Sequence, residues 1–108
     1  RQIEFYPEKM TFVGLDKIIK KKTNNNYKFD IRFHVEPNVK IMKTQDKKTI
    51  FIELNGEGWK FTCENYDINI DNGLYFGKKN LYTENQNIFI SGISNNQTEN
   101  IKWEIKKI

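Results

Sequence analysis

Most of the chain alternates between apolar and polar residues with a period of two, the spacing of a strand that buries one face. The clearest case is the segment 29–36, in which four apolar residues alternate with four polar or charged ones. Segments 68–71 and 101–106 repeat the pattern, and no segment carries a convincing helical stripe. Turn-forming residues separate these runs at short intervals. The chain therefore predicts an all-β fold, an antiparallel β-sandwich of about eight to ten short strands.

The strongest local prediction is a hairpin around Asn55-Gly56. This dipeptide favours a two-residue type I′ turn, because both positions require positive φ. The flanking segments 49–54 and 57–62 are rich in β-branched and aromatic residues. A two-residue loop fixes the register, so one side of the ribbon should be apolar. The cross-strand pairs expected on that side are Ile52 with Trp59 and Ile50 with Phe61.

Two further local features are predicted on weaker patterns. Asn72-Gly73 predicts a second tight turn by the same rule, which would pair Ile70 with Tyr75. The segment 16–22 admits a helical turn, although two consecutive β-branched isoleucines oppose it.

The chain has 108 residues, of which 37% are hydrophobic and 14% aromatic. This length corresponds to a single domain, 1–108, and the large rings offset the small apolar fraction in building a core. The chain starts at Arg1 and alternates like a strand at once. We therefore expect a fragment from the C-terminal end of a longer protein. No apolar run is long enough to span a bilayer, so no membrane partner is expected.

The net charge is +4 and the pI is about 9.1. Lysines gather in the segments 17–22, 40–48 and 106–107. One interpretation is solvated loops and sheet edges, where lysine also prevents edge-to-edge pairing. The other is a surface that faces an anion, either an acidic glycan or a nucleic acid. Basic and aromatic residues form no obvious stacking platform, so nucleic acid is the weaker option.

The only histidine and one of the two arginines lie on the polar side of segment 29–36. Arg32 and His34 are two positions apart, which places them roughly 7 Å apart on one face of a strand. Arginine pairs with carboxylates and histidine exchanges protons near neutral pH, so a ligand contact and direct catalysis are both open. The third option is a ladder of Asp30, Arg32, His34 and Glu36 that satisfies its own charges or contacts a neighbouring domain.

Other chemistries have less support. One histidine and one cysteine do not make a usual zinc site, and segment 67–73 resembles a calcium loop but lacks the bidentate glutamate. Cys63 is expected to be a buried small apolar residue. Trp59 is either a core residue or a platform for sugar stacking. We assign no catalytic residue, metal or cofactor, and the candidate substrate-binding residues are Arg32, His34, Glu57 and Lys60.

Several short motifs resemble a known family. They are FDIRFHVEPNV at 29–39, GEGWKF at 56–61, IFISG at 88–92, and a final strand around Trp103. In this order they are similar to the C-terminal β-domain of bacterial heparinase II/III-like proteins, a polysaccharide lyase family. The family often reads RFHLHP, whereas the second histidine position here is Glu36. No role of that second histidine is therefore carried over.

The resemblance implies a parent protein whose N-terminal α/α toroid is the partner domain and which cleaves acidic polysaccharides, such as glycosaminoglycans, by β-elimination. The family's catalytic groups lie largely on the toroid and on an early β segment. The present domain is therefore expected to be accessory and not to turn over alone. The alternative function is a free-standing binding module for acidic glycans. The resemblance implies a bacterial origin and leaves both periplasm and cytoplasm open as the location.

Overall fold

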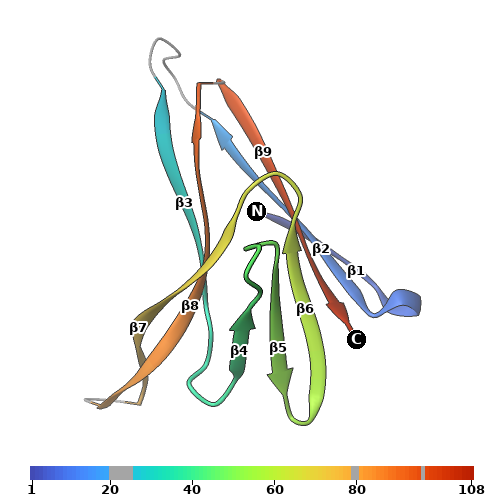
Figure 1. Ribbon diagram of the computed structural model, residues 1–108, viewed down its shortest axis with the longest axis vertical. Helices are drawn as coiled ribbons and strands as arrows, with labels where there is room; N and C mark the ends of the chain where they lie inside the picture. Colours follow the sequence, from blue (N-terminus) through green and yellow to red (C-terminus); the bar gives the residue numbers. More distant parts are fainter. Residues whose placement is uncertain (20–25, 79–80, 96) are drawn as a thin grey trace.

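The computed structural model describes residues 1–19, 26–78, 81–95 and 97–108, and these form two antiparallel sheets (Figure 1). The six-stranded sheet has the order β1-β2-β9-β6-β5-β4, and the three-stranded sheet has the order β3-β8-β7. A 3-10 turn, η1 (Pro7–Lys9), follows the first strand. The predicted antiparallel β-sandwich is confirmed. Its strands are β1 (Gln2–Tyr6), β2 (Thr11–Ile19), β3 (Tyr27–His34), β4 (Lys40–Lys43), β5 (Thr49–Leu54), β6 (Glu57–Cys63), β7 (Ile68–Lys78), β8 (Leu81–Ser94) and β9 (Thr98–Lys107).

The predicted hairpin is confirmed in its turn and in its register. Asn55 and Gly56 have φ values of 52° and 77°, the left-handed conformations that a type I′ turn requires. Strands β5 and β6 pair Ile52 with Trp59 and Ile50 with Phe61, as expected from a two-residue loop. Alternation then places all four side chains on the same face of the six-stranded sheet, the face that carries its core residues Ile50 and Phe61.

The second predicted turn, at Asn72-Gly73, is wrong. Strand β7 runs straight through it, and Ile70 pairs with Ile88 on β8 instead of with Tyr75. Gly73 is needed for space: a Cβ there would lie 2.5 Å from Nδ2 of Asn87 and 2.9 Å from Oδ1 of Asn85. The glycine therefore accommodates neighbouring side chains within a continuous strand.

The helical turn considered for segment 16–22 is also wrong as far as Ile19, because β2 extends through that residue. Strand β2 is hydrogen-bonded to β1 on one edge and to β9 on the other, and this pairing satisfies its backbone better than an isolated turn would. The remaining positions, 20–22, lie outside the described residues. No helix among the described residues is long and apolar enough to cross a membrane.

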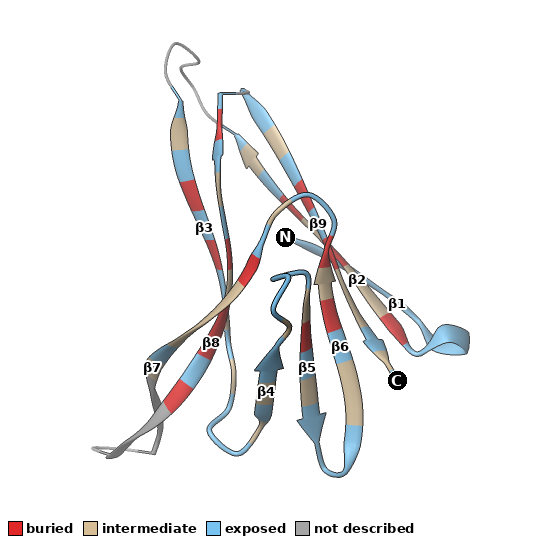
Figure 2. Ribbon diagram, viewed as in Figure 1, coloured by how far each residue is buried: buried red, intermediate tan, exposed pale blue. Residues whose placement is uncertain are grey.

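The core lies between the two sheets (Figure 2). Its buried residues occupy alternate positions of the strands, as the period-two pattern predicts. The six-stranded side contributes Ile50, Phe61, Cys63, Ile101 and Trp103. The three-stranded side contributes Phe29, Ile31, Ile88 and Ile90, together with the first residue of β7, Ile68.

Three aromatic rings join the sheets at the centre of this core. The centroid of the Trp103 ring lies 4.9 Å from that of Phe33 and 5.7 Å from that of Phe61. Phe33 and Phe61 in turn have their centroids 5.1 Å apart, edge to face. Such ring pairs add to the free energy of burial, so β3, β6 and β9 are held together by one cluster.

A buried carboxylate accepts a hydrogen bond from the indole N–H of this cluster. Trp103 Nε1 donates a hydrogen bond of 3.2 Å to Oδ2 of Asp16. Arg1 Nε donates to Oδ1 of the same carboxylate at 2.7 Å, and the guanidinium carbon lies 4.5 Å from the centroid of the Phe33 ring. A buried carboxylate is tolerated only when it is paired and hydrogen-bonded, and Arg1 and Trp103 meet both conditions.

The Trp103 ring also requires glycine at position 14, its cross-strand partner on β2. A Cβ at Gly14 would lie 2.1 Å from atoms of the indole, far inside van der Waals contact. A Cβ at Gly58, by contrast, would have its nearest neighbour at 3.6 Å, on the side chain of Ile108.

We expect Gly14→Ala to lower the free energy of unfolding by about 1–3 kcal/mol, because the added methyl group overpacks the core against an immobile ring. The matched variant Gly58→Ala should stay within about 0.5 kcal/mol of the parent sequence. Urea unfolding followed by tryptophan fluorescence measures both. Equal midpoints for the two variants would contradict this account of Gly14.

Candidate functional site

The polar side of β3 forms part of the outer face of the three-stranded sheet. The register places Arg32 opposite Phe89 and His34 opposite Asn87, both on the central strand β8. On the far side of β8, Asp71 of β7 is also opposite Asn87. Three strands therefore contribute to one polar surface, which we call the β3 face. It contains Asp30, Arg32, His34, Asn69, Asp71, Asn85, Asn87 and Phe89.

Arg32 is held by carboxylates on both sides. Its Nε donates a 3.0 Å hydrogen bond to Asp30 on the same strand, and Nη1 donates one of 2.5 Å to Asp71 on β7. The guanidinium carbon lies 5.1 Å from the centroid of the Phe89 ring beneath it. The hydrogen bond to Asp71 raises the pKa of Arg32 above its ordinary value. The side chain thus spans the sheet, and its charge is already matched by two acids.

His34 is exposed, but one nitrogen of its ring takes part in a hydrogen bond. Its Nδ1 lies 3.0 Å from Oδ1 of Asn87. Because Asn87 Oδ1 also accepts a hydrogen bond of 3.1 Å from Nδ2 of Asn85, it is the acceptor in this group and Nδ1 carries the proton. The other nitrogen, Nε2, is then the basic one when the ring is neutral.

The two asparagines beneath His34 are buried although they lie on the outer face: Asn85 is 5% and Asn87 is 6% exposed. Asn85 Nδ2 donates a further hydrogen bond of 2.9 Å to the carbonyl of Val35. Oδ1 of Asn85 and Oδ1 of Asp71 are both buried and have no hydrogen-bond partner within the described residues. The β3 face therefore contains two buried acceptor atoms, one on Asp71 of β7 and one on Asn85, the cross-strand partner of Gly73 on β8.

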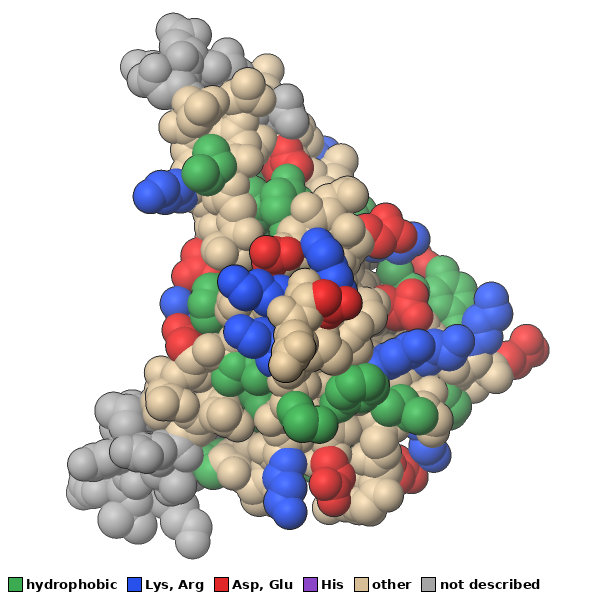
Figure 3. Space-filling model, in the orientation of Figure 1, with side chains coloured by type: hydrophobic (Ala, Val, Ile, Leu, Met, Phe, Trp, Pro, Cys, Tyr) green, Lys and Arg blue, Asp and Glu red, His purple; other side chains and the backbone are tan. Residues whose placement is uncertain are grey.

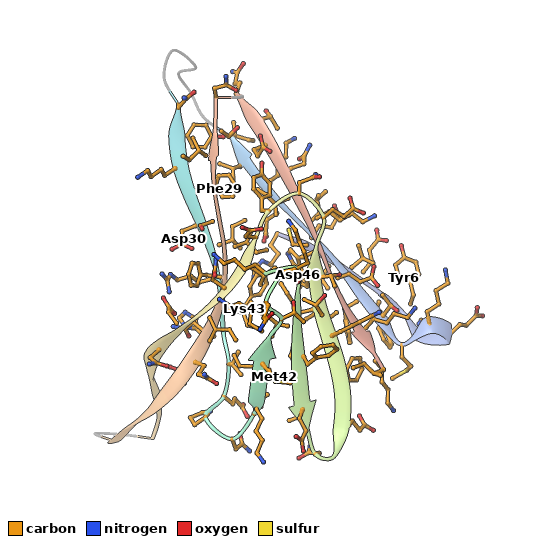
Figure 4. All side chains as sticks on the ribbon, viewed as in Figure 1. Tyr6, Phe29, Asp30, Met42, Lys43 and Asp46 are labelled. Carbon is orange, nitrogen blue, oxygen red and sulfur yellow. The ribbon has the colours of Figure 1, made fainter. Side chains whose placement is uncertain are left out.

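A lysine from the other sheet reaches this face. Lys43 of β4, labelled in Figure 4, donates a hydrogen bond of 3.2 Å to Oδ1 of Asn69 on β7. Figure 4 also shows Asp30 projecting from β3 away from the six-stranded sheet. Lys43, Asn69 and the two buried asparagines were not identified from the sequence, because only the strand register reveals that they are neighbours of Arg32 and His34.

The other two predicted residues lie elsewhere. Glu57 forms an ion pair of 3.3 Å with Lys107 at one end of the six-stranded sheet. Lys60 points to the outer face of that sheet, opposite Lys106 on β9 and Phe51 on β5. Figure 3 shows the charged side chains of both signs beside a hydrophobic group over β4 and β5. Arg32 and His34 are thus adjacent, whereas Glu57 and Lys60 belong to two separate places.

The remaining candidates have clear positions. Cys63 is 5% exposed, as expected of a core residue, and burial raises the pKa of its thiol. Trp59 lies on the core-facing side of β6 but is only half-buried. It lines a groove of about 350 Å³ in which every lining residue is apolar. Within the described residues, no group of three or more His, Cys, Asp or Glu side chains is placed to hold a metal ion.

We expect Arg32 and Asp71 to be energetically coupled, because their ion pair connects the two edge strands of the three-stranded sheet. In a double-mutant cycle, Arg32→Ala with Asp71→Asn should destabilise the domain less than the sum of the single variants. Lys48 and Asp67 form a control ion pair at 3.1 Å whose side chains are each 53% exposed, and this pair should couple less. Additive losses in urea unfolding for Arg32 and Asp71 would contradict the coupling.

One of three comparisons with known proteins found a match. No curated protein and no solved structure matches the chain. One family model does match, that of the heparinase II/III-like, C-terminal family, and it spans residues 1–104 of the 108. The matched region includes every strand of both sheets apart from the last residues of β9. The chain belongs to the heparinase II/III-like, C-terminal family.

Proposed function

We propose that this β-sandwich is an accessory domain of a heparinase II/III-like polysaccharide lyase, in which the β3 face lines part of the substrate groove. The family supports a domain of a polysaccharide lyase and implies an N-terminal domain in the parent chain. On its own, the sandwich has no turnover in this proposal, and the N-terminal domain supplies the catalytic groups.

The ion pairs that Arg32 already makes support the proposal that the isolated domain does not turn over substrate. β-Elimination from a uronate needs a cation to neutralise the sugar carboxylate, a base for the C5 proton and an acid for the leaving oxygen. On the β3 face the one guanidinium is already paired with Asp30 and Asp71. A sugar carboxylate would have to displace two intramolecular carboxylates before the charge became available.

The two buried acceptors support a role in lining the groove, and they are the observation that carries the proposal. A buried oxygen without a donor costs about 1–3 kcal/mol, and within the described residues neither Asn85 Oδ1 nor Asp71 Oδ1 has a donor. Sugar hydroxyl groups are suitable donors. His34, hydrogen-bonded to Asn87 beside them, adds Nε2 as a further polar group for the same ligand.

The proposal is tested by incubating the isolated domain and the parent lyase with heparin, heparan sulfate and alginate. The ultraviolet absorbance of the unsaturated product should rise for the parent and stay flat for the domain. In the parent, Asn85→Ala should lower kcat/KM by roughly tenfold, the equivalent of about one hydrogen bond. The control is Lys28→Ala, on the same face of β3 but roughly 20 Å from His34, which should leave kcat/KM unchanged.

Two results would argue against the proposal. Steady product formation by the isolated domain would rule out the accessory role. Equal kcat/KM values for the parent and its Asn85→Ala variant, with the fold intact, would remove the β3 face from the groove.

A second candidate, a binding module for acidic glycans, has support on the outer face of the six-stranded sheet. Lys60 and Lys106 are direct cross-strand partners and both are exposed. Like charges in directly opposed positions repel each other, and a bound anion would relieve that repulsion. Arg32 is less suitable for this role, because both of its acidic neighbours already neutralise it.

We expect heparin to bind the isolated domain in a salt-sensitive manner if this second function holds. Lys60→Ala combined with Lys106→Ala should then weaken binding by tenfold or more, whereas Lys9→Ala, an exposed lysine in η1, should not. Titration calorimetry at low and moderate salt measures the effect. Identical heparin affinities for the double variant and the unchanged domain would eliminate these lysines as the binding site.

A further inference from the structure

The six-stranded sheet has an apolar surface that the second sheet does not cover. The register aligns Phe5 with Phe12 and Phe12 with Ile105 across β1, β2 and β9. Phe5 and Phe12 are stacked with their centroids 4.5 Å apart, and the centroid of Phe12 lies 6.2 Å from that of Trp59. We call this surface the open face. Its residues are Ile3, Phe5, Phe12, Ile52, Leu54, Trp59 and Ile105.

The open face is a continuation of the core. Ile105 follows Ile101 and Trp103 at the next inward position of β9, and Ile52 follows Ile50 on β5. The buried members of each series lie under the three-stranded sheet, whereas Ile3, Phe5 and Leu54 are 54%, 45% and 40% exposed. Figure 1 shows the reason: β3 lies on one side of the molecule and β1 on the other, so three strands cover only part of six.

The size of the molecule agrees with a missing cover. Its accessible surface is 7911 Å², about 1,600 Å² more than a free-standing monomer of 13.0 kDa exposes. Its radius of gyration is 15.4 Å, against about 13 Å for a compact domain of this length. The excess is comparable to the area that neighbouring domains of one chain bury, roughly 600–1,500 Å².

Arg1 lies where the covered part of the six-stranded sheet meets the open face. Its guanidinium lies over Phe33 and Trp103, and Figure 1 marks the N-terminus between the two sheets. The family implies an N-terminal domain in the parent chain, and we take that domain as the occupant of the open face.

We propose that the open face is the surface on which the N-terminal domain of the parent chain docks. The docking surface of that domain is apolar, because the groove along Trp59 offers only apolar lining. An apolar segment placed there completes the core on the β1 side of the sandwich. This inference rests on the accessory role proposed above, to which it adds the face of the contact, and it does not depend on what the β3 face binds.

Cysteine labelling of the full-length parent tests the proposal. Leu54→Cys places a thiol on the open face. Met42→Cys places one on the outer face of the same sheet, where Met42 is 66% exposed (Figure 4). The natural Cys63 is buried and serves as an internal indicator of folding. Maleimide incorporation at each site is followed over time by peptide mass spectrometry, at two protein concentrations that differ a hundredfold.

Docking predicts that, in the parent, the thiol introduced by Leu54→Cys reacts at least tenfold more slowly than the one introduced by Met42→Cys. This difference should hold at both concentrations, while Cys63 stays unlabelled. Rates for the two introduced thiols that agree within about twofold, as two exposed positions would otherwise give, overturn the proposal. Protection of the open-face thiol that disappears on dilution also overturns it, because it identifies a second copy as the occupant. None of these rates depends on lyase activity, so they separate this inference from the proposed function.

Discussion

The Trp103 ring has to satisfy several neighbours at once, and the arrangement of both sheets follows from this constraint. The ring lies over Gly14 of β2 and takes the space that a side chain there would fill. The edge of one ring packs against the face of the other where Trp103 contacts Phe33 of the opposite sheet. The indole N–H needs an acceptor inside the core, which Asp16 provides. Because an unsatisfied indole N–H would cost stability, packing and hydrogen bonding fix the same position of the ring.

Local turn chemistry predicted one turn of this fold correctly and one wrongly, although the two dipeptides are identical. Asn55-Gly56 forms the expected turn, whereas Asn72-Gly73 lies inside a long strand. The difference is in the surroundings: the first pair lies between two apolar runs that match across the turn, and the second adjoins the buried asparagines of β8. Gly56 is required because its φ is positive, whereas Gly73 is required because neighbouring side chains leave no space for a Cβ. The sequence alone does not show which of these two reasons applies to a given glycine.

The candidate site could likewise be predicted only in part from the sequence. Alternation correctly placed Arg32 and His34 on the polar side of β3, and predicted that Asp30 would be their neighbour. It did not predict Asn87 or Asp71, because these partners depend on how β3, β8 and β7 align over long separations in the sequence. The chain is also rich in asparagine, so composition did not distinguish the two that are buried from those in loops.

Strand β9 has a consequence for how the molecule assembles. It lies between β2 and β6 and is hydrogen-bonded to both. Among the described strands, the β1–β2 hairpin therefore joins the rest of its sheet only through β9, the last of them to be synthesised. Thr11 pairs with Lys106, far along the sequence. Contacts this distant in sequence form slowly, since loop closure precedes any gain from pairing. Until β9 emerges from the ribosome, both edges of the β1–β2 hairpin are unpaired and its apolar side is uncovered, so the nascent sandwich is prone to aggregation and a substrate for chaperones.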